Sequence, residues 1–428
     1  MGKSIKIKNI KEKFEKLITT GFFYVFGSTI LNKVITFIST TLLGRIVSKT
    51  EYGSFTFAWN IFSFILLFSG FGIESGSMQV LSENEEDQYK FNGFYQYGLR
   101  TGMKFNVLLA FITIVIALFI NLPIKGSNEI LLILSFLPEG MFIYGMQFSF
   151  LRSLKENKKF SALSIINTVT LMLFSLLGAR IFKARGMAFA YYFANIITIV
   201  FGTRYLRVPF MSTGYKNINN YDKRDLLSIS GISMINNGLA QILYLSDVFI
   251  VGIVMTNNSS VATYKVATTI PTALTFIPTS IVIFIYPYFA SHRKDTEWCL
   301  SNFKQTIFAV GAFNIIITLI LLLLAPQIII FVFGKQYSDA IYPFRILVIS
   351  YLFQGTFRVI SGNLLISQRK LLFNTIEGII SGLINIIADY FFISYYGLIG
   401  AAYATLIVMI LSGIFCTTYL LYTLKKAK

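Results

Sequence analysis

The sequence predicts an all-α integral membrane protein with about a dozen transmembrane helices. Hydrophobic residues make up 55% of the 428 residues, charged residues only 13%, and the mean hydropathy is +0.68. A soluble domain has about a quarter charged residues, so the solvent of this chain is predicted to be lipid. Because one crossing needs about 20 apolar residues, the chain has room for about twelve crossings and little else.

The apolar stretches are separated by short polar loops, and each is expected to form one spanning helix. The expected spans are residues 19–47, 55–81, 95–122, 130–151, 160–182, 187–206, 226–255, 261–290, 305–333, 341–367, 373–394 and 399–423. Gly, Ser and Asn recur inside them, as in packed membrane helices, and no stretch has the alternating pattern of barrel strands.

Charge asymmetry predicts the orientation of the chain. Most of the 37 Lys and Arg residues fall in the N-terminal tail, the C-terminal tail and the even-numbered loops, which places both termini in the cytoplasm. The formal charge of +18 then reflects topology and attraction to anionic headgroups, not nucleic-acid binding. The Lys-rich start, Lys3 to Lys16, precedes an apolar run too long for a secretory signal, so we expect a short amphipathic surface helix and then the first span.

Several kinds of chemistry are not expected. The distant Cys299 and Cys416 and the single His292 argue against disulfides, His-based metal sites and a Cys/His nucleophile. No phosphate-cradling loop of a nucleotide-hydrolysing protein is present, so we expect no cofactor. Transport is then expected to be driven by an ion gradient, the membrane potential or a substrate gradient, with H⁺ or Na⁺ as the coupling ion. The longest loop, Arg207 to Asp225, is expected to be cytoplasmic, which argues against an enzyme with an external catalytic domain.

The chain also repeats itself. Gly186-Met-Ala-Phe-Ala190, which opens the sixth expected span, returns as Gly400-Ala-Ala-Tyr-Ala404 at the twelfth, an offset of 214. Six spans per half give both halves the same membrane orientation. We therefore predict two six-helix lobes, residues 1–215 and 216–428, arranged as in an alternating-access transporter with its site between the lobes.

Polar side chains line one face of three expected spans, at intervals of three to four residues. These faces comprise Thr29, Asn32, Lys33, Thr36 and Thr40 in the first span, Ser233, Asn237, Gln241 and Tyr244 in the seventh, and Asn374, Glu377, Ser381, Asn385 and Asp389 in the eleventh. They are typical of a polar cavity, and the alternative is hydrogen bonding between packed helices.

Charges at membrane depth cost about 2.5–3.5 kcal/mol each and need partners or water. Basic groups suit an anionic substrate and acidic groups suit a coupling cation, although the alternative for each is a buried ion pair. The candidate substrate-binding residues are Lys33, Arg45, Asn237, Gln241, Arg345, Arg358 and Asn385, and the candidate coupling-ion residues are Asp247, Glu377 and Asp389. Pro271 and Pro278 in the eighth span predict a kink that can act as a hinge.

Short motifs resemble one family along the whole chain. They are Leu43-Gly-Arg-Ile-Val-Ser-Lys-Thr-Glu-Tyr-Gly53, Gly70-Phe-Gly72, Asp247-Val-Phe-Ile-Val-Gly252, the Tyr264 segment, Phe333-Gly-Lys-Gln-Tyr337 and Tyr396-Gly-x-x-Gly-Ala-Ala402. This pattern is similar to the polysaccharide flippases of the multidrug/oligosaccharidyl-lipid/polysaccharide (MOP) superfamily, which also contains the MATE exporters and lipid II flippases.

The resemblance implies a flippase that moves an undecaprenyl-diphosphate-linked oligosaccharide across the cytoplasmic membrane, with the sugar in a basic cavity and the lipid tail in the bilayer. It also implies a polysaccharide polymerase or glycosyltransferases as partners. The alternative is a MATE-like exporter of drugs or metabolites, whose cavity would be more apolar and acidic. Lys33, Arg45 and Arg358 favour the diphosphate.

Overall fold

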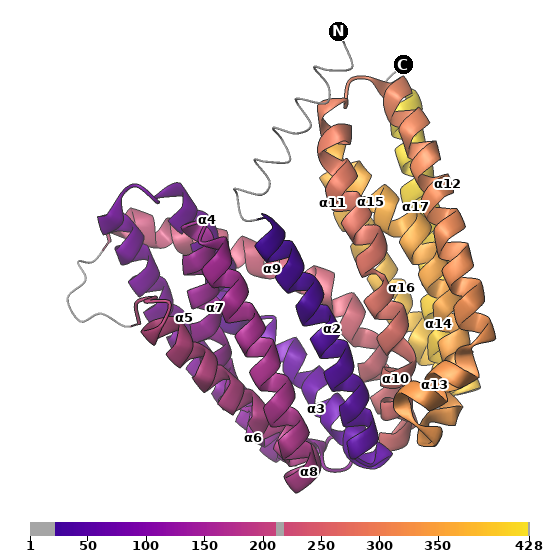
Figure 1. The fold of residues 1–428 in the computed structure, drawn as a ribbon, viewed down its shortest axis with the longest axis horizontal. Coiled ribbons are helices and arrows are strands. Elements are labelled where there is room, and N and C mark those ends of the chain that lie inside the picture. Colours follow the sequence, from indigo (N-terminus) through magenta and orange to yellow (C-terminus); the bar gives the residue numbers. More distant parts are fainter. Residues whose placement is uncertain (1–21, 211–217, 427–428) are drawn as a thin grey trace. The chain divides into compact units, whose positions relative to one another are not determined.

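The computed structural model describes residues 22–210 and 218–426, and within these ranges it contains helices and no strands. Figure 1 labels most of the helices along the chain, from α2 in indigo to α17 in yellow. The helices are α2 (Phe22–Ile46), α3 (Lys49–Leu66), α4 (Ile73–Glu83), α5 (Gln88–Phe119), α6 (Ser127–Leu134), α7 (Leu137–Ser153), α8 (Asn157–Arg204), α9 (Asn220–Met255), α10 (Asn258–Leu274), α11 (Phe276–Ser291), α12 (Thr296–Leu323), α13 (Ala325–Phe333), α14 (Ile341–Phe353), α15 (Val359–Ser367), α16 (Leu371–Tyr396) and α17 (Leu398–Lys426). The expected surface helix around Lys3 to Lys16 lies outside the described residues.

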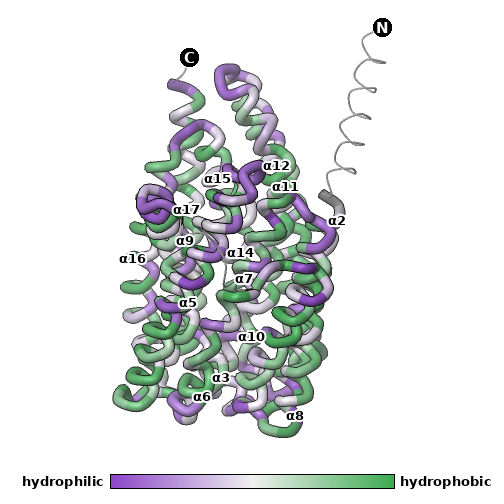
Figure 2. The backbone as a smooth tube through the Cα atoms, turned by 90° about the vertical axis from the view of Figure 1, so that its left-hand side faces the viewer, coloured by the Kyte–Doolittle hydropathy of each residue, from purple (hydrophilic) through white to green (hydrophobic). Residues whose placement is uncertain are grey.

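Within the described residues, each expected span falls on a helix, on part of a helix or on a run of consecutive helices. The predicted all-α membrane fold is confirmed. Among the described residues, seven helices are long and apolar enough to cross a membrane, or up to nine if each bent pair is one span. Figure 2 shows hydrophobic residues along much of the length of these helices. The number of crossings and the cytoplasmic position of the termini stay predictions.

Interruptions between helices lie close to glycine or proline residues. The 3₁₀ segment η1 (Ser69–Gly72) joins α3 to α4 with a bend of 43°, and Gly70, Phe71 and Gly72 have φ values of 55°, 56° and 70°. In the eighth expected span only Thr275 separates α10, with Pro271, from α11, with Pro278, and its φ of −59° and ψ of −17° are still helical. The kink that the prolines predicted, and its action as a hinge, stay predictions.

The contacts within the chain define two compact units. Unit 1 contains residues 1–47, 61–122 and 127–238, and unit 2 contains residues 48–60, 123–126 and 239–428. Unit 2 thus includes the first two thirds of α3, and α9 belongs to both units. The division into transport lobes at residue 215 stays a prediction.

The fifth and sixth expected spans form a hairpin of two helices in unit 1, which together carry the label α8, and the eleventh and twelfth form the hairpin of α16 and α17 in unit 2. Both pairs turn at a residue with positive φ, Lys183 (φ 51°, ψ −131°) and Gly397 (φ 59°, ψ −141°). A Cβ added to Gly186 would overlap the Gly178 carbonyl, and one added to Gly400 would overlap the Phe392 carbonyl. The backbone geometry of this turn therefore recurs at the offset of 214 that the Gly186 and Gly400 motifs predicted.

Each unit has its own apolar core. In unit 1, buried side chains of α4, α5 and α7 pack together, with Leu99 and Met146 fully buried at its centre. In unit 2, side chains of α11, α12, α15 and α17 do so, with Ile360 and Cys416 fully buried. The large apolar side chains left exposed on spanning helices, such as Phe308 at 80%, suit contact with lipid chains.

Candidate functional site

Two carboxylates lie together in unit 2, held by hydroxyl and amide donors from three helices. Asp247 of α9 accepts hydrogen bonds at Oδ2 from Tyr264 Oη of α10 and from Thr405 Oγ1 of α17, both at 3.0 Å. The Asn385 amide of α16 lies 2.6 Å from Asp247 Oδ1 and 3.0 Å from Asp389 Oδ2, so one Nδ2 bridges the two carboxylates. We call these five residues the carboxylate cluster.

The cluster is poor in compensating charge. Asp389 is fully buried and Asn385 is 3% exposed, and Asp389 Oδ1 has no hydrogen-bond partner among the described residues. The ion pairs found in the described part of the chain do not include Asp247 or Asp389. Two neighbouring negative charges at low dielectric repel each other strongly, so the site is complementary to a bound cation or proton.

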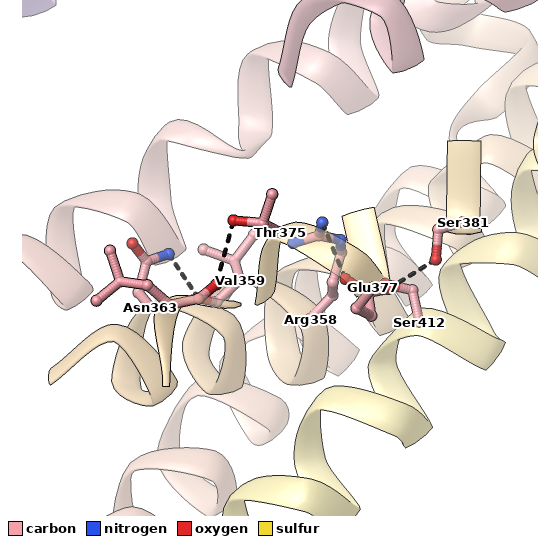
Figure 3. A network of polar contacts seen from close by, with 8 residues as sticks. Arg358, Val359, Asn363, Thr375, Glu377, Ser381 and Ser412 are labelled. Atoms are coloured by element: carbon pink, nitrogen blue, oxygen red, sulfur yellow. Dashed lines mark hydrogen bonds and ion pairs between the residues drawn. The ribbon is translucent and has the colours of Figure 1, made fainter. Parts of the chain in front are cut away.

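A second polar group, which we call the arginine cluster, comprises Arg358, Glu377, Ser381 and Ser412 (Figure 3). The Arg358 Nη2 lies 3.4 Å from Glu377 Oε2. Ser381 donates to Glu377 Oε1 at 2.6 Å, and Ser412 donates to the same oxygen. Arg358 ends the π-helical turn η3 (Gln354–Arg358), a feature that often marks functional sites. Glu377 is therefore buried and paired with a half-buried arginine, in line with the ion-pair alternative considered above, and its role in ion coupling stays a prediction.

The remaining predicted substrate residues lie on both units. In unit 1, Lys33 and Arg45 are exposed on α2, and Asn237 donates to Ser75 Oγ at 3.3 Å. In unit 2, Gln241 is exposed on α9 and the Arg345 guanidinium lies 5.9 Å from the centroid of the Tyr342 ring. Their shared role in one cavity stays a prediction, whereas Asn385 lies in the carboxylate cluster.

The polar faces differ in what they contact. Asn32 of α2 donates to Ser164 Oγ of α8 at 2.6 Å, which is a hydrogen bond between packed helices. On α16, in contrast, Glu377, Ser381, Asn385 and Asp389 are all buried within unit 2 and meet polar groups of neighbouring helices. The eleventh expected span thus carries both polar clusters.

Sequence reasoning did not select Tyr264, Thr405 or Ser412 as site residues. Tyr264 lies in a segment that resembles the family pattern, which was a usable signal. Thr405 and Ser412 stand on α17, a helix with no periodic polar face, so no pattern in the sequence distinguishes them from hydroxyls that bond to their own helix.

This arrangement of apolar helices around buried charges is that of a multi-pass membrane protein, and the solved structures whose fold it shares are membrane transporters. The chain superimposes on a multidrug resistance MATE transporter of the MOP superfamily in an inward-facing conformation with a TM-score of 0.73 and 13% identity, covering 92% of this chain and 95% of that one. The lipid II flippase MurJ gives 0.70 and 18%, covering 93% and 86%, and a MOP superfamily transporter from Pyrococcus furiosus gives 0.60 and 14%, covering 95% and 94%.

The family follows from the sequence itself. Residues 18–293, more than half of the chain, match the model of the family described as polysaccharide biosynthesis protein, and the chain belongs to that family. No curated protein sequence matches it. The predicted membership is confirmed at the level of the polysaccharide biosynthesis family, and the chain shares the fold of the MATE and MurJ structures, which are a multidrug transporter and a lipid II flippase.

Proposed function

We propose that this protein is a flippase that moves lipid diphosphate-linked oligosaccharide repeat units across the cytoplasmic membrane by alternating access. The observation that carries the proposal is its membership in the polysaccharide biosynthesis family. The fold it shares with a lipid II flippase supports a lipid-linked substrate. Polysaccharide polymerases and glycosyltransferases are the partners such a step requires, because they make its substrate and consume its product.

The basic candidates give the substrate its anchor. A diphosphate pairs well with guanidinium groups, whose planar N–H donors match two phosphate oxygens. Lys33 and Arg45 on α2, together with Arg345 and Arg358, supply positive charge on helices that carry few other charges. Neutral polar groups such as Asn237 and Gln241 suit the hydroxyls of the sugar.

The carboxylate cluster is the proposed site of the coupling cation. Asp247 and Asp389 share the Asn385 amide, Thr405 bonds to Asp247, and Asp389 Oδ1 has no hydrogen-bond partner among the described residues. Oxygen ligands suit Na⁺, and a carboxylate pair equally suits a single proton. A cation bound there shifts the conformational equilibrium only by its different affinity for the two states, so the contacts from α9, α16 and α17 have to differ between those states.

The substrate assignment is tested by reconstituting the purified protein in liposomes and measuring the transfer of a fluorescent lipid diphosphate-linked oligosaccharide between leaflets. We expect Lys33→Gln, Arg45→Gln and Arg358→Gln each to reduce transfer about tenfold or more, because each removes a charge-assisted contact. Arg185→Gln is the matched control, because it removes an arginine charge that pairs with Glu129 and is not a candidate for substrate binding. Normal transfer by all three variants, or drug efflux without any lipid transfer, would favour the exporter instead.

Coupling is tested in the same liposomes with imposed Na⁺ and H⁺ gradients. Asp247→Asn and Asp389→Asn should abolish the dependence of transfer on the gradient while substrate still binds. Glu83→Gln, an exposed carboxylate at the end of α4, is the control. Stable Asp247 and Asp389 variants that respond to the gradients like the wild type would disprove this assignment.

A further inference from the structure

A pocket of about 170 Å³ opens on the outside of unit 2, between α16 and α17. Its lining is apolar except for Glu377 and Ser381. Both helices are apolar enough to span a membrane, and the lining side chains Ile380 and Phe415 are 50% and 52% exposed. Exposed apolar groups on a spanning helix face lipid, so the pocket opens toward the hydrocarbon of the bilayer.

The pocket adjoins the arginine cluster, because two members of that cluster, Glu377 and Ser381, line it. The Glu377 carboxylate also contacts Ser412 and Arg358, which are not among the lining residues (Figure 3). Glu377 is 5% exposed, whereas Arg358 retains 23%. The carboxylate therefore separates an apolar, lipid-facing space from a guanidinium that retains some access to solvent.

The contact between Glu377 and Arg358 is long for an ion pair. The distance of 3.4 Å between Arg358 Nη2 and Glu377 Oε2 exceeds the roughly 2.7–2.9 Å of a strong charge-assisted hydrogen bond. The contact uses one nitrogen of a group that has five N–H donors. A ligand with several anionic oxygens can therefore compete with the single carboxylate.

The fold does not require this carboxylate. At the offset of 214, Glu377 corresponds to Leu163 of α8, which is fully buried in unit 1. Ser381 and Ser412 correspond to Asn167 and Thr198, which hydrogen-bond to each other directly at 3.0 Å. The same helix pair is therefore held in unit 1 without a buried charge, which favours a functional reason for Glu377.

We propose that the pocket between α16 and α17 binds the isoprenoid segment next to the diphosphate of a prenyl diphosphate, and that the diphosphate replaces Glu377 as the ion-pair partner of Arg358. The inference rests on the proposed function and names the part of unit 2 that receives the lipid carrier. In a prenyl diphosphate the hydrocarbon begins directly at the anion, whereas glycerol and ester groups separate the acyl chains of a phospholipid from its phosphate. A site with an apolar pocket at one end and an arginine behind it fits the first geometry.

The test measures binding to the purified full chain in detergent with three probes: undecaprenyl diphosphate, inorganic pyrophosphate and phosphatidylglycerol. Ile380→Trp fills the pocket and should weaken undecaprenyl diphosphate binding about tenfold, the equivalent of roughly two buried methylene groups, and leave pyrophosphate binding unchanged. Ile387→Trp is the matched control, because Ile387 lies on the same helix, is 57% exposed and does not line the pocket.

A second test asks whether the diphosphate replaces Glu377 as the partner of Arg358. Glu377→Gln removes the competing charge and should tighten the binding of both undecaprenyl diphosphate and pyrophosphate about tenfold. The double variant Glu377→Gln, Arg358→Gln leaves no unpaired charge and should lose this gain. If Glu377→Gln does not fold, the Ile380→Trp result still decides the case, since it leaves the ion pair intact.

Three results would overturn the inference: equal undecaprenyl diphosphate binding by the Ile380→Trp and Ile387→Trp variants, unchanged affinities in a folded Glu377→Gln variant, or equally strong binding of phosphatidylglycerol. Each of these leaves the proposed function standing if the wild type binds undecaprenyl diphosphate. A wild type that binds no prenyl diphosphate would instead reject the proposed function.

Discussion

The helix pair in α8 and the helix pair of α16 and α17 share one design and differ in their buried charges. Both have a tight turn at a positive φ, a glycine against a carbonyl eight residues earlier, and a polar contact between the two helices. In α8 the contact is a neutral bond from Asn167 to Thr198, whereas in the second pair Ser381 and Ser412 both donate to Glu377. The comparison teaches that packing and turn geometry make the hairpin, and that the acidic residues are an addition to it.

The largest effect is expected when the charge is moved to the neutral pair. Leu163→Glu places a carboxylate in the fully buried position of unit 1 that corresponds to Glu377. An uncompensated buried charge costs several kcal/mol, so we expect little folded protein in the membrane. Membrane abundance and thermal unfolding in detergent measure it, with Leu163→Met as the volume-conserving control. A stable Leu163→Glu variant would show that unit 1 also tolerates the charge.

The shared turn gives the next largest effect. Gly186→Ala and Gly400→Ala each place a Cβ against a backbone carbonyl, which cannot yield as a flexible side chain can. We expect each to lower the free energy of unfolding by about 1–3 kcal/mol. Gly378→Ala on α16 is the control, because no atom lies within 4 Å of its added Cβ. Unequal losses at Gly186 and Gly400 would break the proposed equivalence of the turns.

The polar contacts between the helices should differ in strength. Ser412→Ala removes a donor to the charged acceptor Glu377 and should cost about 1.5–3 kcal/mol. Thr198→Val removes a neutral acceptor for Asn167 and should cost about 0.5–1.5 kcal/mol. Thermal unfolding of the two variants in the same detergent checks the order. Equal losses would mean that the charge of Glu377 does not strengthen its hydrogen bond with Ser412.

The smallest expected change is a gain. Lys183 has φ 51° and ψ −131°, a backbone region that glycine adopts easily and lysine does not, while the second hairpin has Gly397 at this position. Lys183→Gly should raise the stability by about 1 kcal/mol, and Gly397→Ala should lower it by a similar amount. Opposite shifts in the unfolding midpoints would confirm the equivalence, whereas a loss in Lys183→Gly would mean that the lysine side chain matters there.

The helices were predictable because each needs a long apolar run, and hydropathy detects such runs directly. The polar face of α16 was predictable too, since Glu377, Asn385 and Asp389 recur at helical spacing. The pairing of Asp247 with Asn385 was not, because it joins positions 138 residues apart in sequence. Thr405 and Ser412 carry no periodic signal.

The pairing of Arg358 with Glu377 was considered from the sequence only as one alternative. It depends on the π-helical turn Gln354–Arg358, which adds a residue to one turn of helix and changes the direction in which Arg358 points. Hydrophobic periodicity has no means of predicting such a turn. The helices themselves were therefore foreseen, while the contacts between their side chains were not.

The first two thirds of α3 belong to unit 2, and this has a consequence for the order of synthesis. Ser54 bonds to Asn258 at 2.6 Å across 204 residues, and Asn60 donates to the Leu245 carbonyl at 3.0 Å. At roughly 5–20 residues per second, the ribosome needs about 10–40 s to make the partners of this segment. Ser54 also donates to the carbonyls of Thr50 and Lys125, which are made early, whereas the Leu245 carbonyl that accepts from Asn60 is made late. A nascent chain arrested near residue 215 would therefore present Asn60 without this partner to the chaperones and proteases that survey unfinished membrane proteins.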